Sequence, residues 1–575
     1  MNQSARITVS GNPIAMHRSM KTRVIYWGAF LLCLGYYFGV GAFPIGHFKQ
    51  DGTSMASGAL QIIQHGWDGP RIDYGRETRP GIFWTLITLR QMTGADPYLL
   101  FSLLTLAAGV GYVIFTAFFT ARFVHIPAPL CGIAILLFFP NSSIWGCYPN
   151  GTAVAGCLGI IAVYLLARTD EPGLATLFIA GAIAGLSILA RVDSFLMGLV
   201  CIPVLYTTDG RKMLKRMAIF LGTGIAVSLA GLLASGCNIF WILHQTQTVL
   251  SKTSASESAQ NIVMKLATNE CFISVLTSFP LLTVFLIILG TGRLFRRRQW
   301  NILWIVIAGI LPVFLVYRTS IYSSPLYYTI PLFALLCLST LEGIPESSRK
   351  AKLCLGVTAA LLFAAQYLIG FSVVLRAKPY FPYARPTLIS LGEKTFSSGP
   401  LLSASLGIGA GGAMANTEVI RFCNGLLFHP IAFHYVKQDF LESFLVMKDY
   451  LEQHQNDQPR LFIYTSAFAS YTQVNKALQD IGFSCHQKIM IEEGCSRMVW
   501  KRGDLTIVHV SQENVLDPWN RNYVLASEPP RDRIIYVTAG GRERSSVEQS
   551  GHVIKAISRK EILGSEAVCV FEVEL

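Results

Sequence analysis

Long apolar runs separated by short polar loops make up roughly the first two thirds of the chain. Most of these runs approach ~20 residues, the length that a helix needs to cross a bilayer. We expect about eleven spans, at positions 24–43, 97–121, 130–145, 152–167, 173–190, 194–206, 217–234, 271–290, 302–317, 326–341 and 353–375. The pattern therefore predicts a polytopic α-helical membrane protein.

Basic residues beside the spans predict their orientation, because Lys and Arg accumulate in short cytoplasmic loops. Segment 1–23 carries four basic residues, and we interpret 24–43 as a signal anchor because it is longer than the apolar core of a signal peptide. The N-terminus is then cytoplasmic, the loop 44–79 lies outside, and an odd number of spans places the C-terminus outside. Further basic clusters fall on the cytoplasmic side of this arrangement, at 211–216, 293–298 and 349–352.

Composition agrees with a membrane protein and excludes several other classes. The chain is 52% hydrophobic and 14% charged, with a mean hydropathy of +0.46, which is too apolar for an ordinary soluble protein. The net charge of +13 falls largely beside apolar runs, where it meets anionic lipid headgroups, so we expect no nucleic-acid partner. The 13 cysteines form no CxxC pair, and we predict no metal site.

From residue 376 onward, charged and turn-forming residues return and no further spanning run occurs. The segment 376–575 has the size of one domain. We expect a helix at 471–481 and strands at 461–465, 487–491, 497–500, 505–510, 533–537 and 567–573, which predict an α/β or α+β extracytoplasmic domain. Its four cysteines allow one disulfide without fixing the pairing; they are Cys423, Cys485, Cys495 and Cys569.

The loop 44–79 concentrates charge in a chain that has little of it. It opens with a helix-like run at 51–64, breaks at Gly66 and Pro70, and ends before the second span. Its charged residues include Asp51, Asp68, Arg71, Asp73, Arg76, Glu77 and Arg79. We interpret this loop as the catalytic outer loop of the membrane domain.

An enzyme that acts outside the cytoplasm needs a donor that has already been carried across the membrane, and a polyprenyl-phosphate sugar meets that need. Its transfer requires a carboxylate that accepts a hydroxyl proton, for which we propose Asp51, with Asp73 or Glu77 as substitutes. It also requires cations that hold the phosphate, and Arg can do so through paired hydrogen bonds without a divalent metal or other cofactor. The candidates at the outer face are Arg71, Arg76, Arg79, Arg191 and Arg318.

Three short motifs follow one another within 24–375. Asp51 opens the outer loop, which closes with Arg79-Pro80-Gly81-Ile82-Phe83-Trp84. The second motif is Leu189-Ala190-Arg191-Val192-Asp193-Ser194-Phe195-Leu196, and the third is Tyr327-Tyr328-Thr329-Ile330-Pro331. Together with the order of spans, they resemble the GT-C class of membrane glycosyltransferases, in particular the bacterial protein mannosyltransferases and the lipid A aminoarabinose transferase.

This resemblance implies a GT-C-like fold over 24–375 and an inverting transfer from a polyprenyl-phosphate sugar to a glycan, lipid or protein acceptor. It also implies an integral protein of the bacterial inner membrane, working in the cell envelope. Asp51 takes the position of the base, with Asp193 and Tyr328 in supporting roles. Two features depart from the family: Gly52 stands where members often have a second acid, and 141–151 contains no acid.

Each site residue also has a purely structural interpretation. Asp51 can serve only to stabilise the start of a helix through the helix dipole. Arg191 and Asp193 can form a structural ion pair at the membrane edge, and the loop arginines can meet headgroups. Four tyrosines fit an interfacial aromatic belt, which we favour for them; they are Tyr317, Tyr322, Tyr327 and Tyr328. The alternative functions are a non-catalytic membrane scaffold and a transporter of lipid-linked or soluble glycans.

Overall fold

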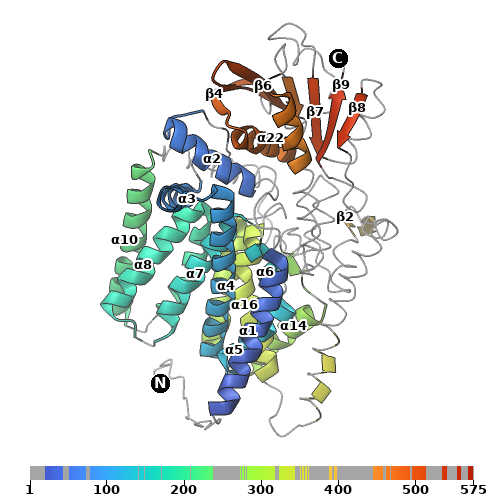
Figure 1. Ribbon diagram of the computed structural model, residues 1–575. Coiled ribbons are helices and arrows are strands. Elements are labelled where there is room, and N and C mark those ends of the chain that lie inside the picture. The colour runs from blue at the N-terminus through green and yellow to red at the C-terminus, as the bar shows by residue number, and fades with distance from the viewer. Residues whose placement is uncertain are drawn as a thin grey trace.

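The computed structural model describes most of the first 342 residues and part of the remainder. The described residues are 20–42, 51–70, 72, 78–139, 141–147, 149–169, 171–206, 209–236, 281–316, 323–342, 388–391, 394–397, 444–456, 462–465, 468–492, 495–512, 534–539, 553–558 and 568–573, with isolated positions between 272 and 361. They comprise a helical bundle and a C-terminal sheet (Figure 1).

Apolar helices pack side by side to form the bundle, with the short helix α2 lying across one of its ends (Figure 1). Most coincide with the predicted spans, because sustained apolarity specifies a buried or lipid-facing helix. The helices are α1 (Met20–Ala42), α2 (Asp51–His65), α3 (Pro80–Thr93), α4 (Pro97–Phe123), α5 (Ala128–Phe138), α6 (Asn141–Cys147), α7 (Gly151–Ala167), α8 (Leu174–Ala190), the 3₁₀ turn η1 (Val192–Ser194), α9 (Phe195–Val204), α10 (Gly210–Ala234), α14 (Leu281–Arg296), α15 (Trp300–Val316) and α16 (Ser323–Glu342).

Three helices in the described ranges are long and apolar enough to cross a membrane: α4, α10 and the part of α16 from Pro325 to Glu342. Shorter apolar helices accompany them, including α7, α8 and α15. The protein is an integral membrane protein. The total of eleven spans stays a prediction, since the span expected at 353–375 lies almost entirely outside the described residues.

One predicted span was placed wrongly, and a second continues past its expected end. The span expected at 130–145 is two helices, α5 and α6, which are separated at Phe139. Phe139 has φ −129° and ψ 61° and precedes Pro140, and a residue before proline is disfavoured in the helical conformation. Of the span expected at 271–290, the part 281–290 belongs to α14, which extends to Arg296, and most of 271–280 lies outside the described residues.

Helices α8 and α10 approach closely through small residues. A Cβ atom on Gly181 would lie 2.5 Å from the carbonyl oxygen of Phe220, and one on Gly185 would lie 2.6 Å from that of Gly224. Ser228 donates a hydrogen bond to the Gly185 carbonyl at 3.3 Å. Packing of this small-residue type brings helices together in a membrane, where the hydrophobic effect no longer drives their association.

The C-terminal region forms a seven-stranded mixed sheet in the order β4-β5-β6-β3-β7-β9-β8. Central strand β3 pairs in parallel with β6 and β7, while the other pairs are antiparallel. The strands are β3 (Phe462–Thr465), β4 (Ser484–Glu492), β5 (Cys495–Arg502), β6 (Leu505–Gln512), β7 (Ile534–Ala539), β8 (Val553–Ser558) and β9 (Val568–Val573); a separate hairpin joins β1 (Leu388–Leu391) and β2 (Lys394–Ser397).

Helix α22 (Phe468–Asp480) covers the sheet, and it lies close to the helix predicted at 471–481. Its residues Val474, Ala477 and Leu478 are fully buried in the core of this region. Strands β5 and β6 form a hairpin that turns at Gly503 with φ +56°, as a glycine does at the first central position of a type II′ turn. Cys485 is a free, buried thiol, so the predicted disulfide does not include it.

Candidate active site

Helix α2 carries the proposed base at its first residue, Asp51. The helix ends at His65, and Gly66 follows with φ +75°, so the helix and its break lie where the sequence predicts them. At the start of the helix, a Cβ on Gly52 would lie 2.8 Å from Cγ of Pro149. The beginning of α2 therefore rests on the segment that leads into α7.

The segment Pro149–Gly151 connects α2 to Arg79. Asn150 caps α7 by accepting hydrogen bonds from the amides of Thr152 and Ala153 at 2.8 and 3.3 Å. A Cβ on the next residue, Gly151, would lie 3.3 Å from Cδ of Arg79 and 3.1 Å from the carbonyl oxygen of Ala190. Gly151 thus lets Arg79 and the end of α8 approach the same point, and Arg79 is buried there with 8% of its surface exposed.

Arg191 and Asp193 follow directly after α8. The Nε atom of Arg191 donates to both carboxylate oxygens of Asp193, at 2.8 and 3.0 Å. The hydroxyl of Tyr328 on α16 donates to the same carboxylate at 3.1 Å. Arg79 and Arg191 both lie close enough to Tyr328 to interact with it electrostatically. Two arginines and one aspartate give these groups an excess of one positive charge, which suits an anionic ligand.

Backbone and hydroxyl contacts hold this cluster in place. The Val192 amide donates to the carbonyl oxygen of Thr78 at 3.1 Å, which ties η1 to the residue before Arg79. Ser187 and Ser194 share a hydrogen bond of 2.8 Å that closes the turn between α8 and α9. The positions of Arg79 and Arg191 are therefore coupled through the backbone.

The interpretation of Tyr327 and Tyr328 as an interfacial belt is wrong. Tyr327 is fully buried and Tyr328 is 1% exposed. The ring of Tyr327 stacks on Tyr112 with centroids 3.9 Å apart, while Tyr328 points toward Asp193. Successive residues on a helix face different directions, so one tyrosine packs the bundle and the other contacts the charged cluster.

The structure brings together four of the predicted site residues, Arg79, Arg191, Asp193 and Tyr328, beside the start of the helix that Asp51 opens. The remaining candidates lie outside the described residues; they are Arg71, Asp73, Arg76, Glu77 and Arg318. Sequence reasoning missed Pro149, Asn150 and Gly151. The available signal was Asn150, a preferred helix-capping residue placed immediately before the apolar run of α7.

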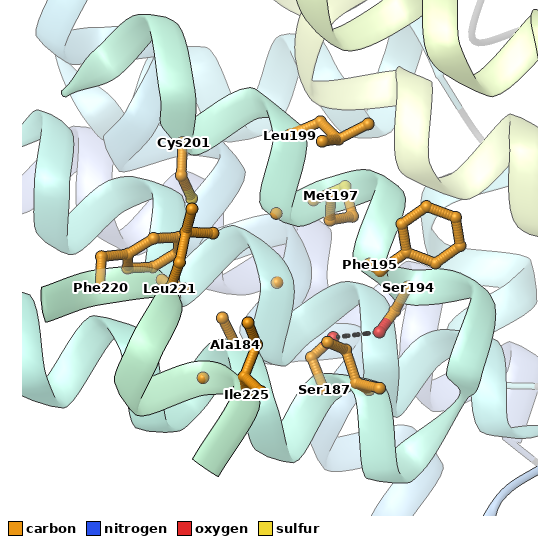
Figure 2. Close-up of a pocket in the computed structure, with 15 residues that line it drawn as sticks. Ala184, Ser187, Ser194, Phe195, Met197, Leu199, Cys201, Phe220, Leu221 and Ile225 are labelled. Atoms are coloured by element: carbon orange, nitrogen blue, oxygen red, sulfur yellow. Dashed lines mark hydrogen bonds between the residues drawn. The ribbon is translucent and has the colours of Figure 1, made fainter. Parts of the chain in front are cut away.

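An apolar pocket of about 210 Å³ lies between α7, α8, α9 and α10 (Figure 2). Ser187 and Ser194, which flank Arg191 and Asp193 in sequence, lie at its wall, and most of the other lining groups are apolar. Phe195 and Ile225 line the pocket and are also 40% and 56% exposed, so it adjoins a surface that faces lipid in a membrane. In the described part of the chain, no three His, Cys, Asp or Glu residues form a group able to hold a metal ion.

The fold is that of the GT-C class of membrane glycosyltransferases. It is similar to that of ArnT from Cupriavidus metallidurans, over 96% of this chain and 98% of that one. The TM-score is 0.50 with 12% identity for ArnT in the apo state, and 0.52 with 13% identity for ArnT bound to undecaprenyl phosphate. No protein-family profile and no curated protein sequence matches the chain. The resemblance to the lipid A aminoarabinose transferase is thus confirmed for the fold.

Proposed function

We propose that the protein is an inverting glycosyltransferase that moves a sugar from a polyprenyl-phosphate donor to an acceptor on the outer face of the membrane. The observation that carries this proposal is the convergence of Arg79 and Arg191 with the start of α2, mediated by Gly151 and Pro149. A cationic cluster beside a helix that begins with a carboxylate has the two components that the transfer requires. The ArnT structure bound to undecaprenyl phosphate adds support from a protein of the same fold.

In this proposal, Arg79 and Arg191 bind the donor phosphate and stabilise the negative charge that develops on it as the sugar leaves. Asp193 and Tyr328 orient Arg191, since the carboxylate accepts from both groups. Asp51 accepts the proton from the acceptor hydroxyl, with Asp73 or Glu77 as the substitutes. Because arginine neutralises the phosphate directly, the reaction is proposed to need no divalent cation or other cofactor. The acceptor is a glycan, a lipid or a protein.

The apolar pocket is proposed to receive the isoprenoid units nearest the phosphate. Its Ser187–Ser194 wall closes the turn that carries Arg191, so a lipid chain in the pocket places its phosphate end near the arginines. Binding of an apolar chain is favourable in proportion to the apolar surface that is removed from water, and the pocket has a largely apolar lining. The same site would then bind the donor's phosphate through the arginines and its first isoprenoid units through the pocket.

The test is transfer of labelled sugar from polyprenyl-phosphate donors by the purified full-length protein. Asp51→Asn is expected to lower the rate by at least about a hundredfold, as loss of a general base does. Arg191→Ala is expected to cost a similar factor, and Arg191→Lys to recover only part of it, because lysine keeps the charge but lacks the planar fork. Gel filtration in detergent checks that each variant is folded.

Asp209→Asn is the matched control for Asp51→Asn. Asp209 also begins a helix, where it accepts hydrogen bonds from the amides of Arg211 and Lys212 at 3.0 and 3.2 Å. If Asp51 merely stabilised its helix, both substitutions would act alike. Wild-type transfer with an unaffected Asp51→Asn variant would assign the base to Asp73 or Glu77. Absence of transfer from every donor would favour a scaffold or a transporter.

A further inference from the structure

Helix α2 presents two different faces to the two parts of the molecule. Met55, Ala59 and Ile62 are buried in a cluster with α3 and α4. Its other face is polar and equally buried, with exposures of 0 to 1%; it consists of Thr53, Ser54, Ser57 and Gln61. Figure 1 shows α2 between the helical bundle and the C-terminal region formed by α22 and β4. A polar face that is fully buried requires hydrogen-bond partners.

The C-terminal region supplies partners for two of these side chains, Gln61 and Thr53, and also contacts the backbone of Ser57. Gln61 donates to the carbonyl oxygen of Cys485 at 2.7 Å, and Gln479 donates to that of Ser57 at 3.0 Å. The hydroxyls of Thr53 and Thr472 lie 3.3 Å apart. Three side-chain contacts therefore join the helix that begins at Asp51 to α22 and β4, and this geometry fixes both the position and the rotation of α2.

A buried lysine lies at the centre of this interface. Lys476 is fully buried, and its Nζ atom contacts Asp480 and lies 3.1 Å from Oδ2 of Asp96. The same atom lies 4.1 Å from the centroid of the Tyr98 ring. Asp96 and Tyr98 belong to the start of α4, so Lys476 joins the C-terminal region to the membrane bundle by charge and by a cation–π contact.

Tyr98 in turn contacts α2. Its hydroxyl shares a hydrogen bond of 2.8 Å with Ser57 and donates to the Thr53 carbonyl at 2.9 Å. Ile72, which follows α2 in the outer loop, is fully buried in the core of the C-terminal region. The first outer loop is thus attached to this region both along α2 and beyond its end.

We infer that the C-terminal region is a positioning device for the outer loop, and that Lys476 is the positioning residue that holds α2, and therefore Asp51, over the arginine cluster. The docking is a property of the described structure, and its catalytic consequence rests on the proposed function. Lys476 acts through α2 rather than on the substrate. A buried charge suits this role, because Asp480 is a partner within α22 itself whereas Asp96 contacts Lys476 only when bundle and C-terminal region are in register.

Hydrogen exchange tests the docking without reference to activity. In full-length Lys476→Met protein, the amides of Asp51–His65 are expected to exchange at least tenfold faster than in wild type, because α2 loses its anchor. Lys501→Met is the matched control. It removes an exposed lysine from β5, in the sheet that α22 covers, and should leave exchange in α2 unchanged. Unchanged exchange in Lys476→Met would overturn the inference.

Transfer kinetics test the catalytic consequence. Lys476→Met is expected to lower kcat at least tenfold while the donor KM stays within about twofold, and Lys476→Arg is expected to restore most of kcat. A disulfide between Thr53→Cys and Thr472→Cys, whose native hydroxyls are 3.3 Å apart, should rescue Lys476→Met by fixing α2 to α22. Rescue that reverses on reduction would exclude a general loss of folding as the cause.

The two readouts separate this inference from the proposed function. Faster exchange with unchanged kcat would overturn the positioning role while leaving the transferase intact. Faster exchange in a protein whose wild type transfers no sugar would support the docking and reject the proposed function together with the catalytic half of the inference.

Discussion

His509 lies in the core of the C-terminal region as a buried, neutral side chain. One ring nitrogen lies 2.9 Å from the Thr465 hydroxyl and the other lies 3.1 Å from Oδ1 of Asn475. Burial, with a smaller effect from Lys488, lowers the pKa of His509 to about 3. In the unfolded chain the pKa of histidine is close to 6.5, so below that pH the unfolded state binds a proton that the folded state refuses.

This difference predicts that the region loses stability as the pH falls from 6.5 toward about 3. In that window the free energy of unfolding falls by up to about 1.4 kcal/mol per pH unit, because the unfolded state binds one more proton than the folded state. Proteolysis of the full-length protein in urea at several pH values measures the slope. His509→Asn should reduce the slope by this amount, whereas His486→Asn, at an exposed position on β4, should retain it.

The sequence predicted one ion pair correctly, because its two charges stand out against an apolar background. Arg191 and Asp193 interrupt an apolar stretch, and the structure pairs them. Lys476 gave no such signal, because it belongs to a soluble-looking segment in which a lysine is normally solvated. Its burial results from docking against the start of α4, where its partner Asp96 stands 380 residues earlier in the chain, and no local pattern encodes a contact at that separation.

At the level of elements, the pocket between α7 and α10 yields a matched pair of glycines. Gly198 lines the pocket on α9 and Gly222 lies on α10 without lining it, and an added Cβ meets no atom within 4 Å at either position. Gly198→Leu is expected to fill part of the pocket and raise the KM for long polyprenyl donors at least fivefold. Gly222→Leu changes the helix to the same extent and should leave that KM unaltered.

Comparison of long-chain and short-chain donors sharpens this test. If the pocket binds the isoprenoid, the effect of Gly198→Leu shrinks as the donor is shortened to the units outside the pocket. An equal effect on all donors would show that the leucine disturbs the Arg191 turn instead. An unaffected Gly198→Leu variant would remove the pocket from the donor site.

Element boundaries were predictable where one period persists, as in α4, α7 and α8, each within three residues of the expected end. The division of α5 from α6 was not, because average apolarity stays high across Phe139 and only the local effect of the following proline ends the helix. Only some features of α2 could be predicted from the sequence. Its helix and its charged surroundings could be read from the sequence, whereas its polar buried face became intelligible only with α22 against it.

In the molecule as a whole, α2 and two of the basic clusters lie at opposite ends of the helical bundle. At one end, α2 contacts the start of α4 through Tyr98 and contacts α22 of the C-terminal region. At the other end of α4, Arg122 donates to the Ala167 carbonyl at 3.1 Å. Arg216 pairs with Glu171 and Arg293 pairs with Glu342, so two of the basic clusters gather with the helix ends that lie away from α2.

The contact between α2 and α22 also constrains the topology. Helix α2 follows the first predicted span and α22 follows the last, so their contact requires an even number of crossings between them and an odd number in total. This agrees with the parity of the predicted eleven spans. Since Lys and Arg favour cytoplasmic loops, the basic end is predicted to be cytoplasmic, and the outer loop and the C-terminal region are predicted to lie together outside.

Cysteine labelling of intact cells decides this orientation. A membrane-impermeant maleimide is expected to label Lys501→Cys, an exposed position on β5, and to label Lys212→Cys, exposed at the start of α10, only after lysis. Wild type serves as the background, since it has 13 cysteines of its own. The reverse pattern would place the arginine cluster on the side that has nucleotide-activated sugars. The reason for a lipid-linked donor would then disappear, even with every contact of the site unchanged, so the orientation and the donor class are tested together.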